Sequence, residues 1–155
     1  MLKATSRCIY IVCFLALGFY GFYSLLQAAE VDQADPNAVT KAILLALQTS
    51  DYTTIIALMP EEKRSEYQAI ISQNPADMDR IFTKYKANAK DIIDVTEFRL
   101  MTTFEGKDGM AGMVKKVGGE IFVIILVKEA DKYYYDSSLF LTQKSYKELP
   151  PFIKE

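Results

Sequence analysis

This chain lacks two of the side-chain types that most often carry out catalysis or bind metals, histidine throughout and cysteine beyond the N-terminal segment. Histidine is absent from all 155 residues, and the two cysteines, Cys8 and Cys13, both lie in an apolar N-terminal segment. The chain therefore excludes a Ser-His-Asp triad, imidazole metal ligands and a histidine pH switch. Beyond the N-terminal segment there is no thiolate to attack a substrate or to bind a metal. We predict no metal site and no cofactor.

Carboxylates and tyrosines remain as candidate acids, bases and oxyanion donors. An isomerase or lyase built from them needs a carboxylate that faces an enclosed pocket. Alternation along two predicted strands assigns to the inward faces Phe98, Leu100, Thr102 and Phe104, then Tyr133, Tyr135, Ser137, Leu139 and Leu141. The outward faces receive Glu97, Arg99 and Asp136. No carboxylate faces inward in this assignment, which argues against an enzyme, although a shift of one residue would turn every side chain to the other face.

The inward aromatic side chains are the candidates for a binding pocket. Tyr133 and Tyr135 would line it together with Tyr85 from a predicted helix and with Phe98 and Leu100. An apolar lining with a few hydroxyl donors suits a hydrophobic or amphipathic ligand. The alternative is that these tyrosines are core aromatics whose hydroxyl groups reach solvent or backbone.

The outward face of the predicted sheet is the candidate surface for a partner protein. Tyr134 and Phe140 stand on it among polar residues, near Arg99. Aromatic residues and arginine dominate the energetics of protein interfaces. The alternative is that this face is covered by the C-terminal tail, with Phe152 and Ile153 packed on it.

Residues 1–29 have the features of an export segment. Lys3 and Arg7 precede an apolar run, Ile9–Leu26, and acidic residues follow it. This asymmetry of charge predicts a cytoplasmic N-terminus and a domain outside the membrane. The run is longer than the apolar part of most signal peptides and shorter than most spanning helices, and Ala28-Ala29 offers a cleavage site. A cleaved signal peptide and a retained anchor both stay open, so we expect a periplasmic or secreted domain, or one held outside the inner membrane by its anchor.

The rest of the chain is predicted to be one α+β domain. Apolar residues first recur with helical spacing, and the helix starts are marked by Asp35-Pro36, Asp51, Pro60 and Asn74-Pro75. From Glu97 onward the period changes to that of strands, with a tight turn at Gly118-Gly119. The unbroken run Ile121–Val127 is typical of a central strand covered on both faces. We predict helices packed on one face of a curved antiparallel sheet, followed by a surface tail, residues 144–155.

Two stretches carry a resemblance to a known family. They are AILLALQTSDYTTIIALM (Ala42–Met59) and KVGGEIFVIILVKEADKYYYD (Lys116–Asp136), in which Tyr133 is the aromatic residue after the last turn. Together with the order of elements, they resemble the nuclear transport factor 2-like superfamily. The resemblance covers Pro36–Gln143, within a predicted domain of residues 30–143. It implies a cone-shaped fold whose pocket, between helices and sheet, serves catalysis, ligand binding or protein association. Exported members include bacterial envelope proteins and periplasmic domains of membrane-anchored secretion-system components.

Two hypotheses for function follow. The preferred one is an exported, non-catalytic binding domain that associates with a partner protein or an apolar small molecule in the bacterial envelope, as a secretion-system or envelope accessory component. The alternative is a small-molecule isomerase or lyase that uses the cone pocket. A homodimer formed through the sheet is a further partner hypothesis. Nucleic acid is not expected as a partner, because the chain has a formal net charge of −2 and lacks a basic run interleaved with aromatics.

Overall fold

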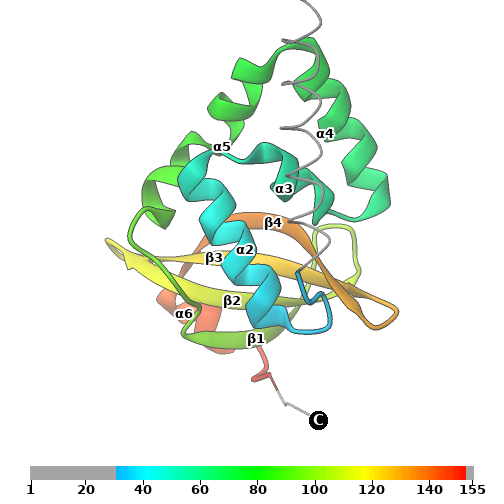
Figure 1. Cartoon of the computed structure of the whole chain (residues 1–155). Coiled ribbons are helices and arrows are strands. Elements are labelled where there is room, and N and C mark those ends of the chain that lie inside the picture. The colour runs from blue at the N-terminus through cyan, green and yellow to red at the C-terminus, as the bar shows by residue number, and fades with distance from the viewer. Residues whose placement is uncertain (1–30, 153–155) are drawn as a thin grey trace, which may run out of the picture.

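The computed structural model describes residues 31–152, which form an α+β domain with a four-stranded antiparallel sheet (Figure 1). This confirms the predicted α+β class with helices and an antiparallel sheet. Four helices come first, then four strands and a short helix: α2 (Pro36–Thr49), α3 (Tyr52–Ala57), α4 (Glu61–Gln73), α5 (Pro75–Ala89), β1 (Glu97–Thr102), β2 (Asp108–Val117), β3 (Glu120–Glu129), β4 (Lys132–Thr142) and α6 (Gln143–Glu148). The segment predicted for export, residues 1–29, lies outside the described residues.

The first two helices begin and end where their capping residues require. The Asp35 carboxylate accepts a hydrogen bond from the Asn37 N–H at the start of α2, and Ser50, with φ of 58°, ends that helix in the left-handed region. Asp51 then caps α3, because its carboxylate accepts hydrogen bonds from the Thr54 N–H (3.1 Å) and hydroxyl (2.6 Å). The caps fix the angle between α2 and α3.

Helices α2 to α5 pack on one face of the sheet, and α4 contributes least to the core. Helix α2 buries one stripe of apolar side chains, whereas α4 has no buried residue and forms a hairpin with α5 (Figure 1). The apolar residues of α4, Tyr67, Ile70 and Ile71, are half-buried and pack against the main core. Most of the core is therefore formed by α2, α3 and α5 with the sheet.

The strands follow each other as a meander in the order β1-β2-β3-β4. The tight turn predicted at Gly118-Gly119 joins β2 to β3, with φ of 60° at Gly118. Strand β3 lies between β2 and β4, and every residue from Ile121 to Val127 is buried, so the prediction of a central strand covered on both faces is confirmed. Side chains from alternate positions of β3 enter two separate clusters, one beneath the helices and one on the opposite face.

A β-bulge in β4 changes which residues face the helices. Leu126 pairs with Tyr135 and Ile125 with Ser137, so Asp136 is an extra residue without a partner position on β3. Beyond the bulge the alternation is reversed: Ser138 and Phe140 face the helices. Leu139 and Leu141 pack in the opposite cluster. The inward assignment of Ser137, Leu139 and Leu141 is therefore wrong, because strict alternation does not survive an extra residue.

The chain after β4 was predicted to be a surface tail, but its first part packs on the sheet as a helix. Helix α6 covers the sheet face opposite the other helices (Figure 1), and its Tyr146 side chain is buried. The Tyr146 hydroxyl accepts a hydrogen bond from the Met113 N–H (3.1 Å) and donates one to the Glu97 carbonyl (3.0 Å). Burial raises the pKa of Tyr146 to about 12. A single buried tyrosine thus fixes α6 to β1 and β2.

Candidate functional site

The interior between helices and sheet, where a pocket was predicted, is filled with aromatic side chains. Tyr135 is 2% exposed, and its hydroxyl lies 2.9 Å from Ser138 Oγ. Burial raises the pKa of Tyr135 well above its ordinary value. Tyr85 stacks on Phe122 and Phe140, with ring centroids 5.9 and 6.2 Å away. The tyrosines predicted to line a pocket here are core residues with satisfied or solvent-facing hydroxyl groups.

The other three residues predicted to line the pocket do not meet in one enclosed space. Tyr133 packs against the core, and its ring lies 5.5 Å from the Lys128 Nζ. Phe98 packs near the sheet edge against Phe152, with ring centroids 6.1 Å apart. Leu100 is 40% exposed on the same edge strand. Within residues 31–152, these three residues therefore lie at separate places on the sheet and not around one site with Tyr135.

The predicted partner surface is also divided by the bulge. Phe140 faces the helices, where the Lys84 ammonium lies 4.1 Å from its ring centroid. Tyr134 lies between two residues that face the helices, so its side chain points to the opposite face. Arg99 is on the α6 side, where its Nη1 donates to the Leu149 carbonyl at 3.1 Å. Tyr134 and Phe140 therefore cannot form one surface, and the prediction that they share a face is wrong.

The bulge places a carboxylate inside the protein, at a position assigned outward from the sequence. The Asp136 side chain is 2% exposed. Its Oδ1 lies 2.8 Å from the Lys63 Nζ, and its Oδ2 accepts a hydrogen bond from the Ser137 hydroxyl at 2.7 Å. Partial burial disfavours the charged Lys63 ammonium, but the hydrogen bond and charge of Asp136 raise the pKa of Lys63 above its ordinary value. Both carboxylate oxygens therefore have partners, Oδ1 on α4 and Oδ2 within β4 itself, which argues against a free general base.

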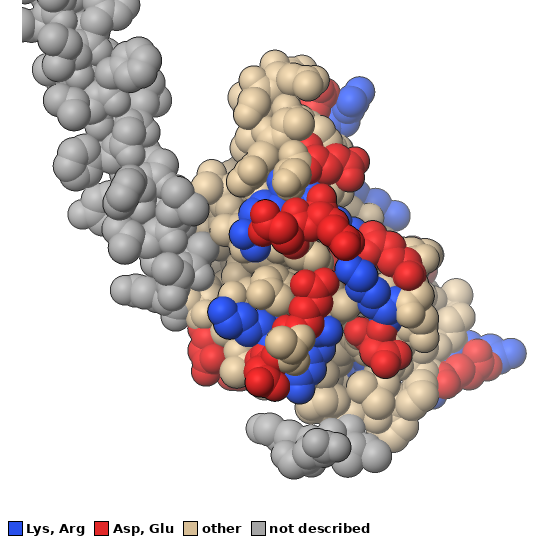
Figure 2. Space-filling view, turned by 90° about the vertical axis from the view of Figure 1, so that its right-hand side faces the viewer, with Lys and Arg blue, Asp and Glu red and all other residues tan. Residues whose placement is uncertain are grey.

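Charged side chains continue from this pair across the surface. Glu105 lies 3.2 Å from the Lys63 Nζ, and Lys107 pairs with Glu62 and Glu129, each at 3.2 Å. Figure 2 shows acidic and basic side chains gathered together on this side of the molecule. Because the charges of opposite sign neutralise one another, this surface offers no strong field of one sign to a ligand.

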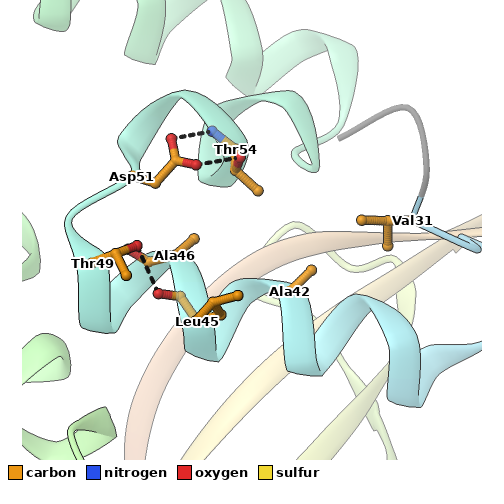
Figure 3. Close-up of a pocket in the computed structure, with 7 residues that line it drawn as sticks. All are labelled: Val31, Ala42, Leu45, Ala46, Thr49, Asp51 and Thr54. Carbon is orange, nitrogen blue, oxygen red and sulfur yellow. Dashed lines mark hydrogen bonds between the residues drawn. The ribbon is translucent and has the colours of Figure 1, made fainter. Parts of the chain in front are cut away.

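A groove on the outer side of the helical layer is a candidate site. It has a volume of about 390 Å³ and lies between α2, the start of α3 and the first described residues of the chain (Figure 3). Its lining is Val31, Ala42, Leu45, Ala46, Thr49, Asp51 and Thr54. Leu45 is 61% exposed, although it is a large apolar side chain in the middle of a helix. We call this site the α2–α3 groove.

The polar side chains that line the α2–α3 groove already have partners. Asp51 accepts both hydrogen bonds from Thr54, and the Thr49 hydroxyl donates to the Leu45 carbonyl at 2.9 Å (Figure 3). The groove therefore presents apolar surface, mainly from the exposed Leu45 and the half-buried Ala42, since Ala46 is almost fully buried. Such a lining suits the apolar side chains of a partner more than a polar substrate.

Sequence reasoning missed this groove, although a signal is present. The apolar residues of α2 whose helical spacing predicts one buried stripe do not include Leu45; they are Val39, Ala42, Ile43, Ala46 and Leu47. Yet the whole segment Ala42–Leu47 is apolar. A surface helix that is apolar all round has more apolar surface than one core can cover. Leu45 is the apolar residue that the core does not cover, and it lies on the side of α2 that borders the groove.

No family model, curated protein or solved structure matches this chain. Between residues 31 and 152, no helix is long and apolar enough to cross a membrane. Within the same stretch, no three or more carboxylate side chains gather in a way that could hold a metal ion.

Proposed function

We propose that this protein is an exported, non-catalytic binding domain of the nuclear transport factor 2-like type. It uses the α2–α3 groove to hold an apolar segment of a partner protein in the bacterial envelope, as an accessory component of the envelope or of a secretion system. The helices-first order and the antiparallel meander support the relationship to that cone-shaped fold. The observation that carries the function is the open apolar groove, with Leu45 exposed at its edge.

Two features favour binding over catalysis. The space between helices and sheet is packed with the rings of Tyr85, Phe122 and Phe140, which leaves little room for a substrate. The buried carboxylate, Asp136, is held by Lys63 and Ser137. An isomerase or lyase would need a carboxylate that is free to exchange a proton with its substrate.

The position of the groove favours a partner at the membrane. Val31 lines the groove and stands two residues after the end of the predicted export segment, residues 1–29. If that segment is retained as an anchor, the groove lies next to the point where the chain leaves the membrane. An apolar segment of a neighbouring membrane protein would then lie within reach of the groove.

The proposal is tested by photocrosslinking in intact cells. A photoreactive amino acid at Thr49, inside the groove, should give a defined protein adduct. Leu45→Asp should abolish the adduct, because it places a charge in the apolar contact. Ile93→Asp is the matched control, since Ile93 is 85% exposed outside the lining of the groove. An unchanged adduct in the folded Leu45→Asp variant would contradict the proposal.

A small molecule as the ligand is the second outcome that this experiment distinguishes. In that case Thr49 gives no protein adduct, and native mass spectrometry of the purified protein finds a bound apolar compound that Leu45→Asp releases. That result would keep the groove as the site and replace the partner protein by a ligand.

A further inference from the structure

The C-terminal residues after α6 lie along the outer edge of β1. Arg99 and Pro151 form an antiparallel bridge. The Leu100 N–H donates to the Pro150 carbonyl at 2.9 Å, and the Phe152 N–H donates to the Phe98 carbonyl at 3.3 Å. Phe152 packs its ring edge-on against Phe98. The segment Pro150–Phe152, which we call the edge segment, thus occupies the place of a fifth strand.

The edge segment forms hydrogen bonds with only some of the backbone groups that β1 directs to this edge. Even-numbered residues of β1 direct their backbone groups to this edge, as the bonds of Phe98 and Leu100 show. The next partner of the Leu100 carbonyl would be the N–H of residue 150, but this is a proline and has none. The Thr102 N–H would be next in the ladder, but the chain there has already turned into α6, which ends at Glu148.

Side chains on this edge are incompletely covered as well. Leu100 is 40% exposed and stands on the same face of β1 as Phe98. A residue paired with Leu100 would place its side chain on that face and cover it. Pro150 holds that position, and Leu100 is still 40% exposed.

We propose that the β1 edge is a strand-addition site for an extended segment of a partner protein, and that the edge segment is its displaceable cover. The segment that fits pairs antiparallel with β1, carries an aromatic residue beside Phe98, and carries an apolar residue other than proline beside Leu100. Such a segment supplies a donor for the Leu100 carbonyl and an acceptor for the Thr102 N–H, which the edge segment cannot do. This site is separate from the α2–α3 groove.

The test measures binding of labelled peptides to the full chain in detergent. One peptide copies residues 147–154 and another has valine in place of proline at position 150. Both are measured against the wild type and against Phe152→Ala, which weakens the cover. We expect the valine peptide to bind at least about tenfold more tightly than the native peptide, because it adds a hydrogen bond and buries Leu100. We expect both to bind more tightly to Phe152→Ala than to the wild type.

Two controls separate this site from the groove and from a simple protective role. Leu45→Asp should leave peptide binding unchanged, whereas Leu100→Asp should weaken it at least about tenfold, because the charge replaces the apolar contact. If neither peptide binds to folded Phe152→Ala protein, the edge segment only protects the strand edge from aggregation, and the proposal is wrong.

Hydrogen exchange of the unaltered protein gives an independent readout. A displaceable cover predicts that the Leu100 amide exchanges at least about tenfold faster than the amides of β3, because local opening exposes it. Equal protection of Leu100 and the β3 amides would mean that the edge segment opens only when the whole domain unfolds, and this would overturn the proposal.

Discussion

The two sides of α2 meet very different surroundings. Toward the sheet, Val39, Ile43 and Leu47 are fully buried. Away from the sheet, Leu45 and the small residues Ala42 and Ala46 border an open groove. One helix therefore serves the core with one side and leaves apolar surface uncovered on the other.

Because of this difference, the proposed binding site lies outside the interior of the fold. A pocket between helices and sheet was the natural expectation from the family resemblance. In this chain that space is occupied by the stacked rings of Tyr85, Phe122 and Phe140, which stabilise the domain. The predictions that follow compare changes on the two sides of the helical layer.

The largest effect is expected from a charge in the interior. Ile124 is fully buried beneath the helices, so Ile124→Asp would bury an unpaired carboxylate. The cost of several kcal/mol or more is comparable to the whole stability of a domain, about 5–15 kcal/mol, and we expect no cooperative unfolding transition. Circular dichroism during thermal denaturation measures this. A cooperatively folding variant would mean that the interior has room for water.

A smaller effect is expected from removing Lys63. Lys63→Met leaves the buried Asp136 carboxylate without its cation, which should cost about 2–4 kcal/mol, less than for a fully buried pair because Lys63 is partly exposed. Urea denaturation measures the loss, and Lys63→Arg is the control that keeps the charge. Equal stability of the methionine variant and the wild type would show that the ion pair does not hold α4 to β4.

The same pair predicts a dependence on pH. Because the pKa of Lys63 is raised by folding, its stabilisation is fully present below the ordinary lysine pKa of 10.5 and is lost as the pH rises through the folded-state value. The difference in stability between wild type and Lys63→Met should therefore be constant near neutral pH and shrink above about pH 10.5. A difference that grows at alkaline pH would contradict the assignment.

The smallest effect on stability is expected on the outer side of α2. Leu45→Asp changes an exposed side chain, so the free energy of unfolding should change by no more than about 0.5 kcal/mol. Urea denaturation beside Ile93→Asp checks this. A loss of several kcal/mol would indicate that Leu45 belongs to the core and that the groove is closed in solution.

Local signals in the sequence predicted most elements of the fold. Asp35, Asp51 and Asn74 mark helix starts because their side chains accept hydrogen bonds from the first free amides. The pair Gly118-Gly119 marks a hairpin because its first residue adopts a positive φ. Such signals depend only on neighbours along the chain.

The bulge in β4 could not be predicted in the same way. The stretch Tyr133–Phe140 has aromatic and hydroxyl side chains at both parities, so no alternation shows where a residue is inserted. The structure inserts Asp136, where Lys63 from α4 pairs with its carboxylate. This pairing is a contact between distant parts of the chain, and the faces of all later β4 residues depend on where the extra residue stands.

The docking of α6 is a second case of this kind. Tyr146 is an isolated aromatic in a polar stretch, Gln143–Glu148, and nothing near it in the sequence indicates burial. Its hydroxyl is satisfied by backbone groups of β1 and β2, far away in the chain. The groove differs from the bulge and from α6, because the sequence does contain a local signal for it, the additional apolar residue Leu45 in α2.

The most direct test of the account compares one photoreactive residue on each side of the helical layer. The probe replaces Leu45 in the groove or Tyr85 in the interior, and the full chain is irradiated in intact cells. The account predicts a protein adduct from position 45, while position 85 gives only crosslinks within the chain. A small-molecule adduct at position 85 with none at position 45 would contradict it and would place the binding site in the interior.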